Sequence, residues 1–390
     1  MKSILFAGKI ENSILSQDIF SITQDYDKAS KQAMDLIENM GDLRPLCVVE
    51  KGKMEQWGGL FSQYGLRFGK DYVDEYTAIR RYGQPHKKLA VFYGNCQVHD
   101  YYDCLNMSGA FNSEYDSVYF KYLEYPRWKE DFLEGLLDIC DLLIMSNECF
   151  DEKFRNCDKY VRKNNAAAKV IHITTYSFRG YFPQTNPHIQ AKGEFDIINE
   201  YFNTFHREDT FVNDMIKHGL SCEEIIERVT SGNSFSPESV KRSLDIALKQ
   251  LEVMDRKSDI TIADYVRDNY RKRRLFKDPV HMENELVWYV ANRLLELFGI
   301  EVNARIPEKE IHYFTELPIY PEVKSALGLE WVDENTHYRV RMQEGMIGLD
   351  TAQFYERYYE LARNAYEIKG SLEIDRNADR VEEWFPGYEN

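Results

Sequence analysis

LAVFYGNCQ, residues 89–97, is the stretch that decides the fold. Its five leading apolar residues predict a strand, and Gly94 permits a sharp turn into a helix that we expect from about residue 97. A cysteine at a helix start meets unpaired amides and the positive end of the helix dipole, which favour a thiolate and can hold an oxyanion. Cys96 is therefore a candidate nucleophile. A buried structural cysteine is the alternative, because free cysteine is among the most buried residue types.

The sequence around this stretch alternates between apolar runs and helical patterns. It predicts strands over 88–93, 116–122, 141–146 and 168–174, separated by helices. Short strands that alternate with helices indicate βαβ units and a parallel sheet. Ligands of such sheets bind beyond the carboxyl ends of the strands. Cys96, Ser146, Asn147, Thr174 and Thr175 are expected there.

Four regions follow from the patterning. Residues 1–86 predict a small N-terminal α/β unit, with apolar runs at 3–7 and 45–49 and helical patterns at 28–40 and 54–64. Residues 87–195 predict the α/β core. Residues 196–300 are strongly helical, with a capping box at Ser221 and Glu224 and helices over about 260–275 and 280–298. Residues 301–390 predict a helical appendage, so the last two regions form a large C-terminal helical cap.

Composition excludes several classes of protein. A net charge of −16 over 390 residues disfavours nucleic-acid binding, which needs Lys and Arg to neutralise phosphates. No apolar run is long enough to cross a bilayer, and the N-terminus lacks a secretory apolar segment, so we expect a cytoplasmic protein. The seven cysteines contain no CxxC pair and the histidines lack metal-ligand spacing, so we expect reduced thiols and no metal.

The motif Asp278-Pro279-Val280-His281 supplies the groups that a cysteine nucleophile lacks. An imidazole can act as its base, and a carboxylate can fix the tautomer of that imidazole. The sequence leaves a second interpretation open. Asp278 and Pro279 are also an ordinary N-cap and N1 pair, which would place His281 in the first turn of the following helix.

Two arginine-bearing segments are candidates for binding an anion. Arg179 lies in an aromatic loop, residues 173–184, that follows a strand and loses all periodicity. Arg267, Arg271 and Arg274 are spaced i, i+4, i+7 on the helix expected over about 260–275, and such a stripe suits a polyphosphate. A solvated helix face and a solvent-exposed arginine are the structural alternatives.

The GNCQ turn, the aromatic loop at Phe178–Pro183 and the stretch from Leu275 to His281 with its apolar helix together resemble the WcbI family of capsular polysaccharide biosynthesis proteins. The resemblance covers roughly residues 87–330 and implies a three-layer core similar to SGNH/GDSL esterases and acyltransferases, with cysteine in place of serine. It implies Cys96 as nucleophile, His281 as base and Asp278 as its acidic partner. Two departures are that Asn95 replaces the aspartate of those esterases and that their oxyanion glycine has no clear counterpart.

The resemblance also implies that coenzyme A or acetyl-CoA binds and that a polysaccharide sugar is O-acetylated. The function predicted is thus an acyl-CoA-dependent O-acyltransferase with a polysaccharide or nucleotide-sugar acceptor. Gly94, Gln97 and Asn147 are the expected oxyanion residues, and Arg179, Arg267, Arg271 and Arg274 the expected CoA ligands. The alternatives are a cysteine-variant esterase or deacetylase and a non-catalytic accessory protein that binds CoA or a nucleotide. The sequence does not decide whether the chain forms a homo-oligomer.

Overall fold

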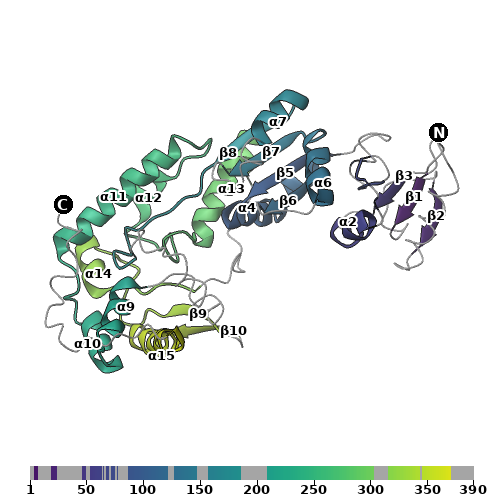
Figure 1. The fold of residues 1–390 in the computed structure, drawn as a ribbon. Helices are drawn as coiled ribbons and strands as arrows, with labels where there is room; N and C mark the ends of the chain where they lie inside the picture. Colours follow the sequence, from purple (N-terminus) through teal and green to yellow (C-terminus); the bar gives the residue numbers. More distant parts are fainter. Residues whose placement is uncertain are drawn as a thin grey trace. The chain divides into compact units, whose positions relative to one another are not determined.

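The computed structural model describes residues 87–121, 127–146, 157–185, 209–302, 315–342 and 345–369, and before residue 87 it describes 4–7, 19–23, 46–49, 53–63, 65, 67–69, 72–74 and 77. The chain divides into two compact units, Met1–Ile173 and Thr174–Asn390 (Figure 1).

The first unit contains a parallel sheet of four strands in the order β6-β5-β7-β8. Its strands are β5 (Lys88–Gly94), β6 (Tyr115–Lys121), β7 (Leu142–Ser146) and β8 (Lys169–Ile173). The intervening helices are α4 (Cys96–Asn106), α5 (Gly109–Glu114), α6 (Arg127–Leu137) and α7 (Cys157–Asn164). The predicted α/β class and parallel sheet are confirmed, and each strand lies within one residue of its predicted bounds.

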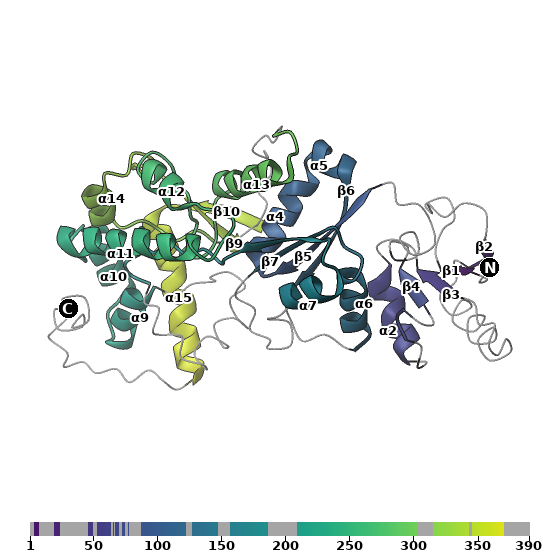
Figure 2. The ribbon, with the colours of Figure 1, turned by 90° about the horizontal axis from the view of Figure 1, so that it is seen from above.

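Helices cover both faces of this sheet (Figure 2). On one face, Leu89, Val91 and Tyr93 belong to a buried cluster that includes Leu133 and Leu136 of α6.

On the other face, the ring of Phe92 contacts the rings of Tyr102 in α4, at 5.3 Å between centroids, and Phe111 in α5, at 6.3 Å. Because every residue of β5 after Lys88 is buried, its apolar run is continuous rather than alternating. The core therefore has three layers, as predicted.

A second parallel sheet precedes this core in the same unit. Its order is β2-β1-β3-β4, with β1 (Ile4–Ala7), β2 (Ile19–Thr23), β3 (Leu46–Val49) and β4 (Tyr72–Asp74), and helix α2 (Met54–Gln63) follows β3. The ring of Phe61 lies 5.0 Å from that of Tyr72, and the ring of Phe68 lies 5.2 Å from that of Phe132 in α6. The described part of residues 1–86 thus contains a parallel sheet and a helix, and Phe68 of this region packs on α6. The helix predicted at 28–40 lies outside the described residues.

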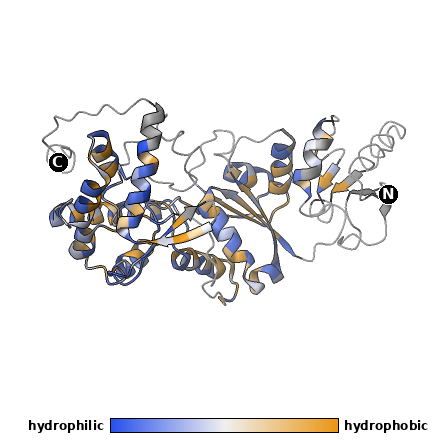
Figure 3. Ribbon diagram, turned by 90° about the horizontal axis from the view of Figure 1, so that it is seen from below, coloured by the Kyte–Doolittle hydropathy of each residue, from blue (hydrophilic) through white to orange (hydrophobic). Residues whose placement is uncertain are grey.

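The described part of the second unit is mainly helical. Its helices are α9 (Thr210–Lys217), α10 (Cys222–Thr230), α11 (Pro237–Asp255), α12 (Ala263–Asn269), α13 (Asn284–Phe298), α14 (Pro321–Leu327) and α15 (Thr351–Lys369), and the antiparallel strands β9 (Tyr338–Met342) and β10 (Gly345–Leu349) form a hairpin. The capping box at Ser221 and Glu224 is confirmed. Most helices carry both hydrophobic and hydrophilic residues, as amphipathic packing requires (Figure 3).

A buried carboxylate joins three helices of this unit. Asp209 caps α9 by accepting a hydrogen bond from the amide of Val212, and its other oxygen accepts from the hydroxyls of Tyr320, at 2.8 Å, and Tyr355, at 2.7 Å. Burial raises the pKa of the Asp209 carboxyl from 3.8 to about 6, although these hydrogen bonds oppose the rise. Tyr320 and Tyr355, which belong to the region expected as a C-terminal appendage, therefore contact the start of α9.

Within the described part of the chain, no helix is both long and apolar enough to cross a membrane. The same residues contain no group of three or more His, Cys, Asp or Glu side chains arranged to hold a metal ion.

Candidate active site

The turn between β5 and α4 makes Cys96 the first residue of the helix. Gly94 ends the strand, and Asn95 is the N-cap with extended backbone angles. The Asn95 side-chain oxygen accepts hydrogen bonds from the amides of Gln97, at 3.0 Å, and Val98, at 3.3 Å. Since a helix begins with four amides that lack helical partners, this cap fixes the helix start that carries the cysteine.

Gly94 is required here by close packing rather than by backbone freedom. A Cβ atom on Gly94 would lie 2.5 Å from Cγ2 of Val98 and 3.2 Å from Cβ of Ser146. Gly94 is not among the glycines with positive φ. Ser146 ends the neighbouring strand β7 and is buried, so the carboxyl ends of β5 and β7 meet at the cysteine turn, as expected for a parallel sheet.

The oxyanion residues expected from the sequence are only partly placed. The Gln97 amide donates to the Asn95 side chain, so the cap already uses this expected oxyanion donor. Asn147 lies outside the described residues.

Two residues that the sequence analysis did not single out lie beside the turn. The hydroxyl of Tyr119 on β6 is within hydrogen-bonding distance of the carbonyl oxygens of Gly94, at 3.1 Å, and Asn95, at 3.0 Å. The ring of His99, one helical turn after Cys96, lies 4.6 Å from the ring of Tyr119. The three-residue spacing from Cys96 to His99 is the signal that could have identified this imidazole.

Cys96 differs from the other described thiols in its surroundings. Its residue is partly exposed, whereas Cys104, Cys140 and Cys157 are buried. Burial, together with nearby Asp100 and Asp103, raises the pKa of the Cys104 thiol. Cys222 also begins a helix and is partly exposed, but desolvation and three neighbouring glutamates raise the pKa of its thiol.

The motif Asp278-Pro279-Val280-His281 forms a tight loop that orients an imidazole. One oxygen of Asp278 accepts hydrogen bonds from the amides of Val280, at 2.8 Å, and His281, at 2.9 Å. The other oxygen lies 2.5 Å from Nδ1 of His281. When Nδ1 donates to this carboxylate, the lone pair is on Nε2, which is the tautomer that a general base needs.

Asp278 therefore contacts the His281 ring and caps a turn of the backbone. It caps a turn, but it is not the N-cap of a helix that contains His281, because α13 begins at Asn284. A bridge between Phe276 and Met282 closes the loop instead, and the Lys277 amide donates to the His281 carbonyl at 2.8 Å. We call residues 277–281 the His281 loop.

The aromatic segment at 176–182 supports the His281 loop. The Phe178 amide donates to the Pro279 carbonyl at 2.7 Å, and the Phe178 ring stacks on that of Phe276 at 5.2 Å. The side chains of Tyr176, Phe178, Tyr181 and Phe182 are fully buried. The sequence predicted that this segment lines a pocket, but these four rings pack in the interior. Arg179, which follows Phe178 in the sequence, is half-buried.

Arg274 hydrogen-bonds to the His281 loop. Its guanidinium donates to the carbonyl of Lys277, at 3.0 Å, and to the carboxylate of Glu316, at 2.9 Å. It also pairs with Glu283 at 3.5 Å. Despite the desolvation of Glu316, Arg274 and Arg339 hold the pKa of its carboxyl below the ordinary value. These contacts commit Arg274 to the interior, so the structure does not present it as a ligand for phosphate. Glu316 is 42 residues away, and no local pattern reveals the pair.

The predicted stripe of three arginines on one helix face is wrong. The helix expected over about 260–275 ends at Asn269. The hydroxyl of Tyr181, at 2.9 Å, and the indole of Trp331, at 3.0 Å, both donate to the Tyr270 carbonyl. That carbonyl would accept from residue 274 in a continuing helix, so these contacts end the helix and let the chain turn into the His281 loop.

The remaining two arginines of the predicted stripe have different surroundings. Arg267 forms ion pairs with Glu252 and Asp264. Arg271 follows the helix, and its Nε donates to the Tyr270 hydroxyl at 2.7 Å. Only Arg271 of the three has no ion pair within the described residues. Cys96 belongs to the first compact unit, and Asp278, His281 and the arginines belong to the second.

Comparison with known proteins identifies the family. The sequence model of the polysaccharide biosynthesis enzyme WcbI matches residues 89–303. The chain therefore belongs to the WcbI family of polysaccharide biosynthesis enzymes. No curated protein matches the sequence.

A solved structure of WcbI has a similar fold. Its TM-score is 0.58 at 15% sequence identity, and the match covers 76% of this chain and 96% of the other. That structure is described as the native protein without a disulfide bond between CoA and one of its cysteines. At this identity the likeness shows the fold, including the parallel sheet and the helices around it.

The first prediction concerns thiol reactivity. Cys96 should react with iodoacetamide faster than Cys222 at neutral pH, because the raised pKa of Cys222 lowers its thiolate fraction. Mass-spectrometric peptide mapping over time measures both rates. Cys222 is a matched control, since each thiol begins a helix and is partly exposed. Equal rates at the two sites would contradict the hypothesis that the surroundings of Cys96 make its thiol a nucleophile.

The second prediction concerns Arg274. Arg274→Gln should lower the free energy of unfolding by roughly 3 kcal/mol, because its removal leaves the buried carboxylate of Glu316 and the partly buried carboxylate of Glu283 with Arg339 as their remaining cation. Arg273→Gln is the control, since its ion pair with Glu285 is exposed on the arginine side and should contribute less than about 1 kcal/mol. Denaturant unfolding measures both, and equal stabilities of the two variants would rule out the structural role.

Proposed function

We propose that the protein is an acyl-CoA-dependent O-acyltransferase that acetylates a sugar hydroxyl in capsular or exopolysaccharide biosynthesis. The observation that carries the proposal is the partly exposed Cys96 at the first residue of α4, on a turn held by Gly94 and Asn95. Family membership supports polysaccharide biosynthesis. The WcbI structure is described in terms of a disulfide bond between CoA and a cysteine. This description supports the proposal that CoA binds with its sulfur close to Cys96.

The nucleophilic role of Cys96 fits its local structure. Its sulfur would attack the thioester carbonyl, forming an S–C bond while the bond from that carbon to the CoA sulfur breaks. The helix N-terminus favours negative charge on the attacking thiolate and on the oxyanion. We propose an SGNH-like core in which Gly94 and Asn95 form the turn that presents the nucleophile.

His281 is assigned the proton transfers. Asp278 holds its ring in the tautomer with the lone pair on Nε2. The imidazole would take the thiol proton from Cys96 and give it to the departing CoA sulfur. In the second half-reaction it would remove the proton of the sugar hydroxyl, whose oxygen attacks the acyl carbon. The bond from that carbon to the Cys96 sulfur then breaks, and the imidazolium returns the proton to that sulfur. A direct transfer, with His281 acting on the hydroxyl and no acyl-cysteine, uses the same base.

A cysteine suits transfer better than hydrolysis. Moving an acyl group from CoA to Cys96 exchanges one thioester for another, so the step is close to thermoneutral. The acyl-cysteine keeps the free energy needed to acylate a hydroxyl, whereas a serine ester would not. We therefore expect slow hydrolysis of acetyl-CoA alone and faster CoA release when the correct sugar is present.

The third prediction tests these roles by kinetics. Release of CoA from acetyl-CoA is measured with and without a panel of UDP-, GDP- and dTDP-linked sugars. His281→Ala should lower the acceptor-dependent rate by about 10²–10⁴, the usual contribution of a general base. Cys96→Ala should abolish covalent transfer, whereas Cys222→Ala is the matched control and should retain the wild-type rate.

Other outcomes would reassign the site. Full activity in Cys96→Ala would leave only direct transfer. Activity lost in His99→Ala but kept in His281→Ala would move the base to the imidazole on α4. Rapid cleavage of simple acetyl esters, with no affinity for CoA and no stimulation by a sugar, would replace the transferase by an esterase.

A further inference from the structure

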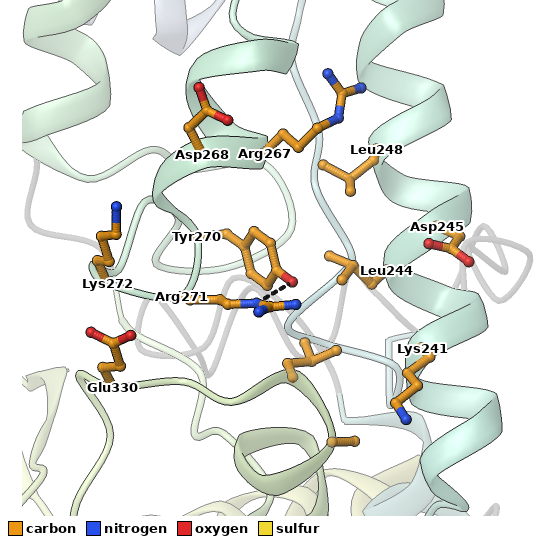
Figure 4. Close-up of a pocket in the computed structure, with 12 residues that line it drawn as sticks. Lys241, Leu244, Asp245, Leu248, Arg267, Asp268, Tyr270, Arg271, Lys272 and Glu330 are labelled. Carbon is orange, nitrogen blue, oxygen red and sulfur yellow. Dashed lines mark hydrogen bonds between the residues drawn. The ribbon is translucent and has the colours of Figure 1, made fainter.

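A pocket of about 690 Å³ lies in the second unit between α11, α12 and α14 (Figure 4). Its volume is within the range of ordinary small-molecule sites. It contains neither Cys96 nor His281. Its lining combines cationic, acidic and apolar side chains.

Three cations of this pocket come from two elements of the second unit. Lys241 comes from α11, and Arg271 and Lys272 come from the turn after α12. None of the three forms an ion pair with any residue that the structure describes. Arg267, at the edge toward Leu248, differs because Glu252 and Asp264 neutralise it. The chain has a net charge of −16. In such a chain, cations from two elements that share a cavity and have no ion pair within the described residues point to an anionic ligand.

The guanidinium of Arg271 is held in place before any ligand arrives. Its Nε donates to the Tyr270 hydroxyl at 2.7 Å, and its Cζ lies 5.4 Å from the centre of the Tyr270 ring. Figure 4 shows the guanidinium beside this hydroxyl and directed toward α11, the helix that carries Lys241. The two terminal nitrogens therefore stay available for a bidentate contact, which suits phosphate oxygens.

The turn that carries Arg271 and Lys272 is also fixed. Buried Tyr181 and the indole of Trp331 donate to the Tyr270 carbonyl, and the Glu330 amide donates to the Arg271 carbonyl at 2.8 Å. A side chain on a fixed turn loses less conformational freedom on binding than one on a mobile loop. The contacts that end α12 thus also present two cations to the pocket.

The other lining residues restrict the class of ligand. Leu244, Leu248 and Leu327 form an apolar wall on which a ring can pack. The carboxylates of Asp245, Asp268 and Glu330 can accept hydrogen bonds from hydroxyl groups. Inorganic phosphate would use only the cations. A molecule with a phosphate, hydroxyl groups and a ring uses all three kinds of wall.

We propose that this pocket binds the phosphate-bearing nucleotide part of a substrate, with Arg271, Lys241 and Lys272 as the phosphate ligands. The proposal rests on the proposed function, in which two substrates carry this chemistry, namely CoA with its ribose phosphate and diphosphate and a nucleotide-linked sugar with its diphosphate. It replaces the predicted arginine stripe by a site built from two elements, and it assigns binding but no chemical step to these residues.

The test is calorimetric titration of the full chain with three probes, which are CoA, 3′-dephospho-CoA and UDP-N-acetylglucosamine. Arg271→Gln and Lys241→Gln should each raise the dissociation constant of at least one probe by about 10- to 100-fold, the loss expected for one charged hydrogen bond. The effect should weaken in high salt.

Matched controls separate the pocket from general charge effects. Lys249→Gln removes an exposed lysine of α11 outside the pocket, and Arg273→Gln removes an exposed arginine next to Lys272 outside the pocket. Both should bind every probe like the wild type. Thermal unfolding of all four variants shows whether each is folded.

The probes distinguish the source of the nucleotide. Weaker binding of CoA alone would assign the pocket to the donor, and a larger effect on CoA than on 3′-dephospho-CoA would place the ribose phosphate there. Weaker binding of the nucleotide sugar alone would assign it to the acceptor. Unchanged dissociation constants in Arg271→Gln and Lys241→Gln, or no binding of any probe by the wild type, would overturn the proposal.

Failure of the pocket and failure of the transferase are separable. If the wild-type protein binds a probe through Arg271 and Lys241 but transfers no acyl group, the pocket proposal stands and the transferase proposal is wrong. If the protein transfers acyl groups and both Arg271→Gln and Lys241→Gln bind the probes as tightly as the wild type, the transferase proposal stands and the pocket proposal is wrong.

Discussion

The structure of the candidate site depends on the absence of a side chain at Gly94. Val98 on α4 and Ser146 on β7 approach this position so closely that a Cβ atom would overlap them. The strand and the helix can therefore meet over a single intervening residue, Asn95, whose side chain caps the helix. Cys96 is therefore the first residue of α4. Close packing at one glycine thus determines where the thiol is presented.

In the second unit, buried contacts likewise hold a candidate reactive side chain, His281, which is itself buried. His281 is oriented by Asp278, whose carboxylate also holds the backbone of the loop. The Arg274 side chain donates to the carbonyl of Lys277 in that loop, and the Phe178 amide donates to the carbonyl of Pro279. Removal of a supporting residue should therefore alter both stability and the orientation of the imidazole. The pocket at Arg271 depends on the same segment, because Tyr181 and Trp331 fix the turn that carries its cations.

Much of the first unit follows from local sequence, and much of the second does not. The continuous apolar run of β5 reflects burial on both faces, which a single-sequence pattern detects well. The arginine stripe failed because helical spacing cannot show where a helix ends. Here Tyr181 and Trp331, both distant in sequence, donate hydrogen bonds to the Tyr270 carbonyl. In a longer helix that carbonyl would accept from a backbone amide instead. Glu316 similarly pairs with Arg274 across 42 residues. Lys241 was not predicted as a ligand, because its relation to Arg271 exists only after α11 and α12 pack.

The most direct test of the central claim is a search for an acyl group on Cys96. The full chain is incubated with acetyl-CoA without acceptor, quenched in acid, digested and examined by mass spectrometry. We predict one acetyl group on the peptide that contains Cys96, none on the peptide that contains Cys222, and loss of the label when the correct sugar is added. Acceptor-dependent CoA release by an enzyme whose Cys96 is never acetylated would contradict the covalent role of this thiol.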